Sequence, residues 1–523
     1  MRKAIGLLIV ATWLGMVGWQ VRRTYYQPEL TRLSEATLAL APGVSFYTLK
    51  MGDRPVGQAT SKLDTVPGGF VLEDVMSLEL PALGQTGVAA VRTTVQLSQA
   101  LEMKTFDFTL ASSAGNFDAK GRMRPDSTLE VTIDSGSGPQ TTTYKMPTAP
   151  VFASVVPIRL AMGEGFKVGK TTRMSVFDPS TLGTRVVEMR VVAMDTLIVP
   201  DSAALDKDTG RWSAAHYDTI PTWQIAEVYG GVSVESWVDA DGRVIKSSSP
   251  LGFSMEKTEY ELALQARDDE RAALARGEPA RGANEDVIFS TAIQSNVDLG
   301  ATTRYDRIRF RLSGVDLSGF QLDGGRQSLV GDTLTVRREN WDALDPGYDL
   351  PYKLMDLKAE LEAEPLIQSD DPRIISAARS ITDARFRGGN DPRRAAATLN
   401  RAVYDMIEKE ITISVPSALQ VLASKKGDCN EHTVLYVALA RALGLPARTA
   451  VGLVYLRGSF YYHAWPEVWL GQWVAVDPTF GTYPADAAHL RFVIGGLAQQ
   501  VDIVRLIGRL HIEVVDTVAA VEQ

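Results

Sequence analysis

Cysteine is nearly absent from this sequence, because Cys429 is the only one among 523 residues. One cysteine excludes an internal disulfide bond, so no covalent cross-link within the chain stabilises the fold. A lone thiol of this kind is a poor structural element. It is therefore a better candidate for chemistry than for support of the fold.

An excess of positive charge is also missing. The chain carries 54 basic and 63 acidic residues, which gives a net charge of −9 and a pI of about 5.3. Proteins that bind nucleic acids present a basic surface, so this balance argues against a nucleic-acid partner. Small molecules, peptides and proteins remain open as partners.

Long hydrophobic runs are missing except at the start, where residues 4–19 carry no charge and have two basic residues on each side. This run of 16 residues lies between the core of a signal peptide and the ~20 residues of a membrane span. The small residues of a cleavage site do not follow it. We predict that residues 1–23 are an uncleaved signal anchor in the cell membrane, with a cleaved signal peptide or a buried helix as alternatives. The body of the protein is then expected in the periplasm or outside the cell.

The length predicts several domains, and residues 42–265 have the pattern of an antiparallel β-rich domain. Apolar and polar residues alternate over 91–97, 106–110 and 129–133, and glycine-rich turns separate these stretches. One-sided alternation is typical of an antiparallel sheet with one covered face. We expect a scaffold there, or alternatively a concave sheet that binds an extended or apolar ligand.

Two shorter segments follow the β-rich region. Residues 266–285 mix charges of both signs and end in glycine and proline, which predicts an exposed linker that is helical at its start. Residues 286–345 return to a strand pattern and are predicted to form a small β module. Three arginines alternate with three apolar residues over 307–312, which indicates a solvated face, or alternatively an anion site.

From residue 350 the pattern becomes helical, and 350–523 are assigned to a last domain, so the predicted fold class is α+β and multidomain. Asp391 should cap a helix that starts at Pro392 and carries an apolar residue at every fourth position from Ala395 to Ile407. Ser417 should cap a short second helix. Residues 503–506 and 510–515 are predicted as closing strands.

Within this domain, Cys429 lies on a short polar turn directly before apolar residues at helical spacing over 434–443. Gly444 and Pro446 mark the end of that helix. The thiol is thus placed at a helix N-terminus, where unpaired N–H groups and the positive end of the dipole favour a thiolate. This placement suits a nucleophile.

A histidine and an aspartate follow in two stretches that are rich in aromatic and β-branched residues. Gly471 and Gln472, between the stretches, predict a hairpin with a two-residue type II′ turn. Such a hairpin would place His463 and Asp477 on neighbouring strands. With Cys429 they would form the nucleophile, base and orienting carboxylate of a catalytic triad.

Four motifs occur in a fixed order: Gly-Asp-Cys-x-Glu-His-Thr, Leu-Gly-Leu-Pro-Ala-Arg, His-Ala-Trp-x-Glu-Val and Asp-Pro-Thr-x-Gly. Together they resemble the transglutaminase-like (papain-like Cys-His-Asp) superfamily in its bacterial exported form, over roughly residues 350–495. The resemblance implies Cys429 as nucleophile, His463 as base and Asp477 as orienter. It does not define the reaction, because that superfamily includes cross-linking enzymes, peptidases, amidases and inactive scaffolds.

Other polar residues near these motifs have simpler interpretations. His432, together with the three triad residues, has the residue types of a zinc site, but two of the four lie where a triad needs them. We therefore expect no metal and no cofactor. Glu431 should stabilise the first helical turn. Asp486 and His489 resemble a segment that often follows the last motif in the superfamily, and we expect them to be structural.

The sequence therefore predicts thiol-dependent acyl transfer at an amide bond. A peptidase, an amidase or a protein-glutamine transferase would fit, with a protein or peptide as substrate. The alternative is a non-catalytic binding or assembly module of the cell envelope on the same scaffold. A complete set of three triad residues favours the enzyme, because a scaffold has no need of all three.

Overall fold

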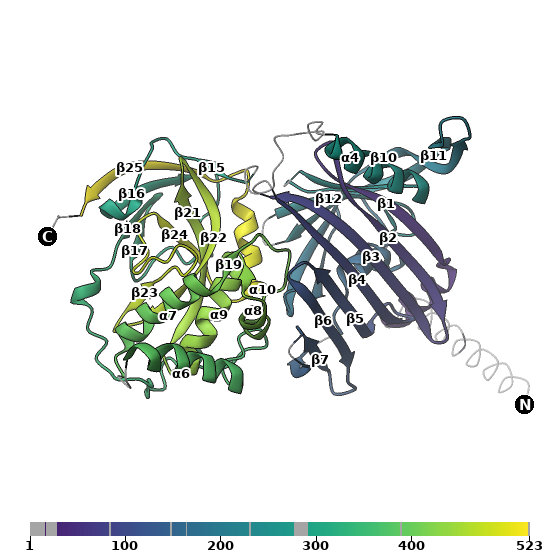
Figure 1. Ribbon diagram of the computed structural model, residues 1–523. Coiled ribbons are helices and arrows are strands. Elements are labelled where there is room, and N and C mark those ends of the chain that lie inside the picture. Colours follow the sequence, from purple (N-terminus) through teal and green to yellow (C-terminus); the bar gives the residue numbers. More distant parts are fainter. Residues whose placement is uncertain are drawn as a thin grey trace, which may run out of the picture.

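The computed structural model describes residues 16, 29–82, 85–136, 138–146, 149–163, 165–229, 232–250, 252–276, 291–386 and 390–520. Figure 1 shows two lobes, a large curled sheet from the N-terminal part of the chain and a mixed lobe of helices and strands from the C-terminal part. The signal anchor predicted in residues 1–23 lies outside the described residues except for Met16. Within these ranges, no helix has the length and apolar character needed to cross a membrane.

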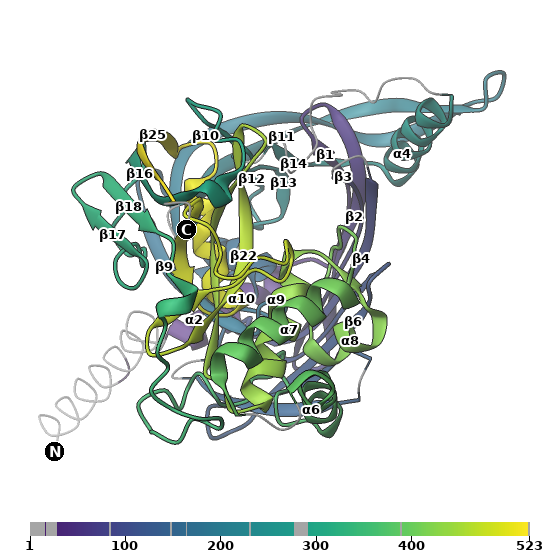
Figure 2. The same ribbon diagram turned by 60° about the vertical axis from the view of Figure 1, so that its left-hand side comes forward.

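The N-terminal lobe is an antiparallel sheet of 14 strands. The strands are β1 (Gly43–Met51), β2 (Arg54–Val66), β3 (Gly69–Ala82), β4 (Gln85–Ser98), β5 (Met103–Ser112), β6 (Gly115–Met123), β7 (Thr128–Asp134), β8 (Gln140–Lys145), β9 (Thr171–Asp178), β10 (Gly183–Asp206), β11 (Arg211–Tyr229), β12 (Val232–Val238), β13 (Val244–Ser248) and β14 (Phe253–Thr258). Strands adjacent in sequence pair with each other except for β8 and β9, and β1 also pairs with β14. The sheet therefore curls, with β8 and β9 as its ends (Figure 2).

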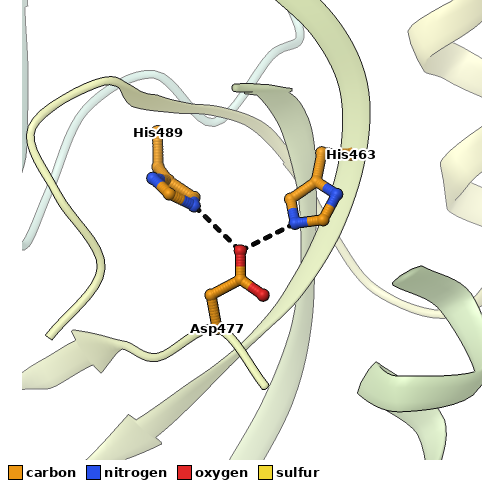
Figure 3. Close-up of side chains that lie close together, drawn as sticks. All are labelled: His463, Asp477 and His489. Atoms are coloured by element: carbon orange, nitrogen blue, oxygen red, sulfur yellow. Dashed lines mark hydrogen bonds and ion pairs between the residues drawn. The ribbon is translucent and has the colours of Figure 1, made fainter. Parts of the chain in front are cut away.

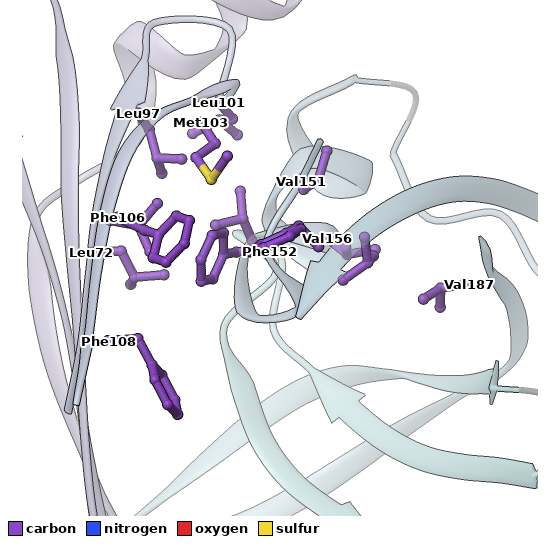
Figure 4. Close-up of a cluster of buried hydrophobic side chains, with 14 of the residues drawn as sticks. Leu72, Leu97, Leu101, Met103, Phe106, Phe108, Val151, Phe152, Val156 and Val187 are labelled. Atoms are coloured by element: carbon purple, nitrogen blue, oxygen red, sulfur yellow. The ribbon is translucent and has the colours of Figure 1, made fainter. Parts of the chain in front are cut away.

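The core of this lobe lies on the concave face of the sheet. The predicted alternation is confirmed, because Val95, Phe106 and Leu129 are buried on this face. The segment between β8 and β9 enters the concavity through the 3-10 helix η2 (Ala153–Val155) and α3 (Val156–Gly163). Figure 4 shows Phe152 against Phe106, with ring centroids 5.5 Å apart. Each such fully buried side chain contributes about 2–3 kcal/mol of hydrophobic free energy.

The charged segment that was predicted as a linker is helical and packed in its first part. Helix α4 (Tyr260–Ala275) contacts β1, β2 and β11, whereas the short α2 (Glu29–Ala36) packs on α3. Glu270 is buried and forms an ion pair with Arg54 on β2 (3.1 Å). Residues 266–275 therefore belong to the sheet lobe and are not an exposed linker. The prediction was wrong here because the charges have partners on the sheet, which a local charge pattern does not reveal.

The C-terminal lobe surrounds one buried helix. Its helices are α6 (Pro372–Phe386), α7 (Pro392–Met406), α8 (Ala418–Ser424) and α9 (Cys429–Ala442). Its main sheet has the order β15 (Ile293–Gln294), β22 (Ser459–Trp469), β21 (Ala447–Leu456) and β24 (His489–Ile494), and β23 (Trp473–Ala475) pairs with the far half of β22. The short strands β19 (Glu408–Lys409) and β20 (Lys426–Gly427) pair in parallel just before α9. Helix α9 packs between the other helices and the β21–β22 pair.

Both predicted helix starts are observed, but only one is capped by its side chain. The Asp391 carboxylate accepts a hydrogen bond from the Arg393 N–H (2.9 Å) at the start of α7. Ser417 precedes α8 without capping it. Its hydroxyl instead accepts a hydrogen bond from the Ser135 hydroxyl of the sheet lobe (2.8 Å) and one from Gln368 Nε2 (3.0 Å). Ser417 thus joins the two lobes.

The predicted small β module does not stand alone. Strands β16 (Tyr305–Ser313), β17 (Gln327–Val330) and β18 (Thr333–Arg337) form a sheet with β25 (His511–Ala519), in the order β17-β18-β16-β25. Phe310 on β16 packs edge to face against Phe460 on β22, with ring centroids 5.7 Å apart. The apolar face of this sheet is therefore covered by the β21–β22–β24 sheet, and the two share one core.

The end of the chain departs from the prediction in one place. Residues 511–519 form a strand as expected, but 503–506 belong to the 3-10 helix η5 (Val501–Leu506), which follows α10 (Leu497–Gln500). The arginines of β16 face β25 and form ion pairs there, with Arg309 2.9 Å from Asp516 and Arg311 2.8 Å from Glu513. These exposed pairs agree with a solvated face.

Candidate active site

Cys429 is the first residue of α9, and a capping box holds the chain in front of it. The Asp428 carboxylate accepts a hydrogen bond from the Asn430 N–H (2.9 Å), and Glu431 Oε2 accepts one from the Asp428 N–H (2.9 Å). The buried Glu431 also accepts a hydrogen bond from the Thr412 hydroxyl (2.9 Å). Glu431 therefore stabilises the first helical turn, as predicted, and places the thiol at a helix N-terminus.

The helix that carries the thiol is rigidly held. Its residues 431–441 are buried, and Gly444 (φ +76°) ends it as the sequence predicts. The N–H of Leu445 donates to the carbonyl of Ala440 (3.0 Å), which closes the last turn. Because α9 is enclosed by protein, the position of Cys429 at its start is well defined.

His463 lies in β22, and Asp477 follows β23 by two residues. The structure brings these buried side chains together, with His463 Nε2 2.8 Å from Asp477 Oδ2. The ring of Phe480 stacks on the imidazole, with centroids 5.0 Å apart, and so helps to orient it. Because Nε2 faces the carboxylate, Nδ1 is the nitrogen left to accept a proton.

The hairpin between these residues is longer than predicted. Trp469 pairs with Trp473, so the connection contains three residues, with Gly471 (φ +81°) in the middle. Leu470 is buried in the helical core, and the additional residue allows the turn to bury it. Asp477 consequently lies beyond the end of β23 rather than on a strand.

Asp477 has more partners than a triad requires. Its Oδ1 accepts backbone hydrogen bonds from Thr479 (2.7 Å) and Phe480 (3.2 Å). Its Oδ2 is also hydrogen-bonded to a second imidazole, through Nε2 of His489 at 3.0 Å. Burial by itself would raise the pKa of Asp477, but the charges and hydrogen bonds of His463 and His489 hold the pKa far below its usual range.

The sequence predicts a merely structural role for His489, but the structure places this residue in the candidate site, beside Asp477. Figure 3 shows that the two imidazoles approach one carboxylate oxygen from different sides. The other nitrogen of His489, Nδ1, lies 2.9 Å from Oδ1 of Asp486. Burial opposes a charge on His489, but Asp486 and Asp477 together raise its pKa to about 9. Burial likewise opposes a charge on Asp486, yet His489 holds the pKa of Asp486 well below its usual range.

Cys429 and His463 line the same pocket, which has a volume of about 630 Å³. The pocket is largely apolar, with walls that include Val454, Leu456 and Phe480, and this character suits an organic ligand. Burial, and then the negative charge of Asp428, raise the pKa of the Cys429 thiol well above its usual value, while a backbone hydrogen bond with Ala464 acts in the other direction. The helix N-terminus therefore does not by itself produce a thiolate, contrary to the sequence expectation.

The residues of the zinc alternative do not come together as a group. Among the described residues, the acidic, histidine and cysteine side chains within metal-ligand reach of one another are His463, Asp477 and His489, whose ligand atoms lie within 4.8 Å. His432 instead directs Nδ1 to the Asp428 carbonyl (2.6 Å). A metal at the observed group would have to displace both hydrogen bonds to the shared carboxylate oxygen.

Comparisons with known proteins match part of the C-terminal lobe to a family. A family model described as the transglutaminase-like superfamily matches residues 379–478. No curated protein matches the chain.

Solved structures similar to this chain include a candidate cysteine protease from Cytophaga hutchinsonii, with 16% identity, a TM-score of 0.27 and coverage of 42% of this chain and 86% of that one. The beta-barrel-like protein of domain DUF1849 from Brucella abortus has 18% identity, a TM-score of 0.30 and coverage of 42% and 95%. The periplasmic domain of TgpA from Pseudomonas aeruginosa has 18% identity, a TM-score of 0.22 and coverage of 36% and 76%. The family match, rather than these likenesses, carries the assignment: residues 379–478 of this chain form a domain of the transglutaminase-like superfamily.

Proposed function

We propose that this protein catalyses thiol-dependent acyl transfer at an amide bond, with Cys429 as nucleophile, His463 as base and Asp477 as orienter. One observation carries the proposal: a thiol at a helix N-terminus lines the same pocket as an imidazole whose Nε2 is hydrogen-bonded to a buried carboxylate. Nucleophile, base and orienting group are the components of such a reaction.

Because its pKa is raised, the thiol is protonated and needs a base, and His463 is proposed to be that base. As the sulfur attacks the amide carbonyl carbon, its proton moves to Nδ1 of His463. The C–N bond then breaks, and the amine leaves with that proton, so a thioester remains on Cys429. Water gives hydrolysis, whereas a second amine gives transfer. Hydrolysis is the simpler outcome, because only water has to reach the thioester.

Two groups are proposed to stabilise the substrate. The backbone N–H of Cys429 is the natural donor to the oxyanion, because it belongs to the open first turn of α9. Tyr462 also lines the pocket, and its hydroxyl is buried and finds no hydrogen-bond partner among the described residues. A substrate carbonyl in the pocket would satisfy this hydroxyl. Peptides and protein side-chain amides carry such carbonyls.

A second function is favoured by a specific observation. The raised pKa of Cys429 means that the surroundings alone keep the thiol protonated, as suits a non-catalytic module for binding or assembly in the cell envelope. Such a module would retain the pocket without needing base catalysis. The two functions therefore differ in whether His463 activates the sulfur.

A thiol-directed acyl probe separates them. Because Cys429 is the only cysteine, labelling of the thiol reports on this residue alone. We expect the folded chain to react faster than the urea-unfolded chain, and His463→Ala to lower the rate by about tenfold or more. His216→Ala is the control, because this histidine is exposed and pairs with Asp201 far from the pocket in the sequence. Equal rates for the folded wild type, the unfolded chain and His463→Ala would support the scaffold.

We further propose that residues 1–23 hold the protein in the cell membrane, with the body in the periplasm or outside. The proposal rests on the charge-flanked apolar run alone. Membrane fractionation of the full chain and of a chain without residues 1–23 tests it. The full chain should sediment with membranes and the shortened chain should not, while thiol labelling stays the same. Recovery of the full chain in the soluble fraction would contradict it.

A further inference from the structure

The carboxylate of Asp477 is shared between two histidines. Oδ2 lies 2.8 Å from His463 Nε2 and 3.0 Å from His489 Nε2, and all three side chains are buried. Oδ1 is already occupied by the two backbone N–H groups that follow it. The pKa of Asp477 is held far below its usual range, so the carboxylate is ionised, and it then accepts four hydrogen bonds with a proton on both Nε2 atoms.

The second nitrogen of His489 also faces an acceptor. Asp486 Oδ1 lies 2.9 Å from Nδ1 and accepts a further hydrogen bond from the N–H of Ala488, while the Thr302 hydroxyl donates to Oδ2. With its oxygens occupied as acceptors, Asp486 has no proton to donate to the imidazole. Hydrogen-bond counting thus places a proton on both nitrogens of His489, in agreement with its raised pKa.

Among the residues that the structure describes, few other charged groups surround this cluster. Arg326 donates to the carbonyls of Ala485 and Asp486, and its guanidinium lies 3.6 Å from Glu339. The titratable groups on neighbouring elements that act on the cluster or are acted on by it are Cys429 and His432 of α9 and His463 of β22. The two carboxylates are therefore the direct partners of His489.

We propose that His489 is a positioning residue: as an imidazolium held between Asp477 and Asp486, it directs the shared carboxylate oxygen at His463. The proposal deepens the proposed function, on which its catalytic meaning rests. The hydrogen bond from His489 fixes the carboxylate, and the carboxylate in turn fixes the ring of His463 through Nε2. Nδ1 of His463 is then left to accept the thiol proton and to return it to the leaving amine.

The experiment uses the full chain with ¹³C,¹⁵N-labelled histidine, followed by NMR of the imidazole groups. Five histidines give a small set of signals, and single His→Gln variants assign them. In the wild type, both ring nitrogens of His489 should remain protonated at about pH 7.5, where an unperturbed histidine is neutral. In His489→Gln, which keeps an N–H donor but removes the charge, the Nε2 proton signal of His463 should shift, because the carboxylate oxygen that accepts this proton has lost its charged second partner.

His216→Gln is the matched control, because this histidine faces Asp201 at 2.8 Å but is exposed. It should leave the His463 signal unchanged. A neutral His489 at neutral pH would overturn the proposal, as would displacement of its ring protons by added zinc, which would make the group a metal site. If His489→Gln does not fold, the wild-type protonation state still decides the question. These readouts do not require turnover, so an inactive Cys429 would refute the proposed function without affecting this test.

Discussion

The charged state of His489 predicts that the fold loses stability at alkaline pH. In the folded protein the pKa of His489 is about 9, whereas in an unfolded chain it is about 6.5. A group whose folded pKa is raised contributes stability that is fully present below the unfolded pKa and is lost as the pH rises through the folded pKa. The loss should therefore fall between about pH 6.5 and pH 9.

The size of this loss of stability follows from the difference between the folded and the unfolded pKa of His489. Each pKa unit corresponds to about 1.4 kcal/mol, so the buried His489 should contribute about 3 kcal/mol at about pH 6 and nothing at about pH 10. Urea unfolding followed by tryptophan fluorescence measures it, with the wild type compared with His489→Gln at both pH values. The advantage of the wild type in unfolding free energy should shrink by about 3 kcal/mol, and this double difference removes the titration of groups that His489 does not influence.

If the difference in unfolding free energy between the wild type and His489→Gln stays constant across this pH range, the reasoning is refuted. It would mean that His489 carries no extra proton in the folded state. His216→Gln controls for the loss of any histidine. Its exposed pair with Asp201 is screened by solvent, so its difference from the wild type should stay within a few tenths of a kcal/mol at both pH values.

Three further variants, one of them with a matched control, test the residues around the site. Glu431→Ala removes the acceptor of the capping box and of the Thr412 hydroxyl, and should lower the unfolding free energy by about 2–4 kcal/mol, measured in urea. Gly444→Ala should cost about 2 kcal/mol or more, because φ is +76° and the new Cβ would lie 2.3 Å from Cβ of Pro351. Gly136→Ala, also at positive φ but with nothing within 4 Å, should cost less, and an equal thermal shift for both glycines would disprove the clash. Tyr462→Phe should slow probe labelling by about tenfold at an unchanged melting temperature, and an unchanged rate would remove Tyr462 from the oxyanion site.

The parts of the fold that local pattern determines could be predicted from the sequence. The start and end of α9 follow from Asp428, Glu431 and Gly444, whose effects reach only a few residues. The alternation of buried and less buried residues in β4, β5 and β7 likewise follows from the apolar residues at every second position. The cap of α7 by Asp391 belongs to the same class.

Other parts depend on contacts between distant segments. Pairing of β16 with β25 joins residues 305–313 to 511–519, and periodicity gives no information on which strands meet. The apolar run 503–506 is too short for its period to separate a strand from a 3-10 helix. The hydroxyl of Ser417 could not be assigned to the lobe contact, since its partner Ser135 lies in another domain.

In the candidate site, too, some residues could be predicted from local motifs, whereas others depend on contacts between distant segments. The motifs identify Cys429, His463 and Asp477, and their spacing resembles that of a known superfamily. His489 could not be assigned from a motif, because its role depends on two carboxylates meeting one buried ring. The direction of the thiol's pKa also could not be predicted, because it depends first on burial of the sulfur in the folded chain and only then on the negative charge of Asp428. An Asp–His pair three residues apart, as in Asp486 and His489, is the signal that would have suggested a charged cluster.

The position of β25 has a consequence for biosynthesis. Figure 1 shows this last strand beside β16, and every residue of the candidate site is encoded between the two. A nascent chain therefore possesses its nucleophile and base long before the sheet that backs them can close. We expect the pairing of β16 with β25 to form only after residue 519 has been synthesised, so the sheet behind the site is completed at the end of folding.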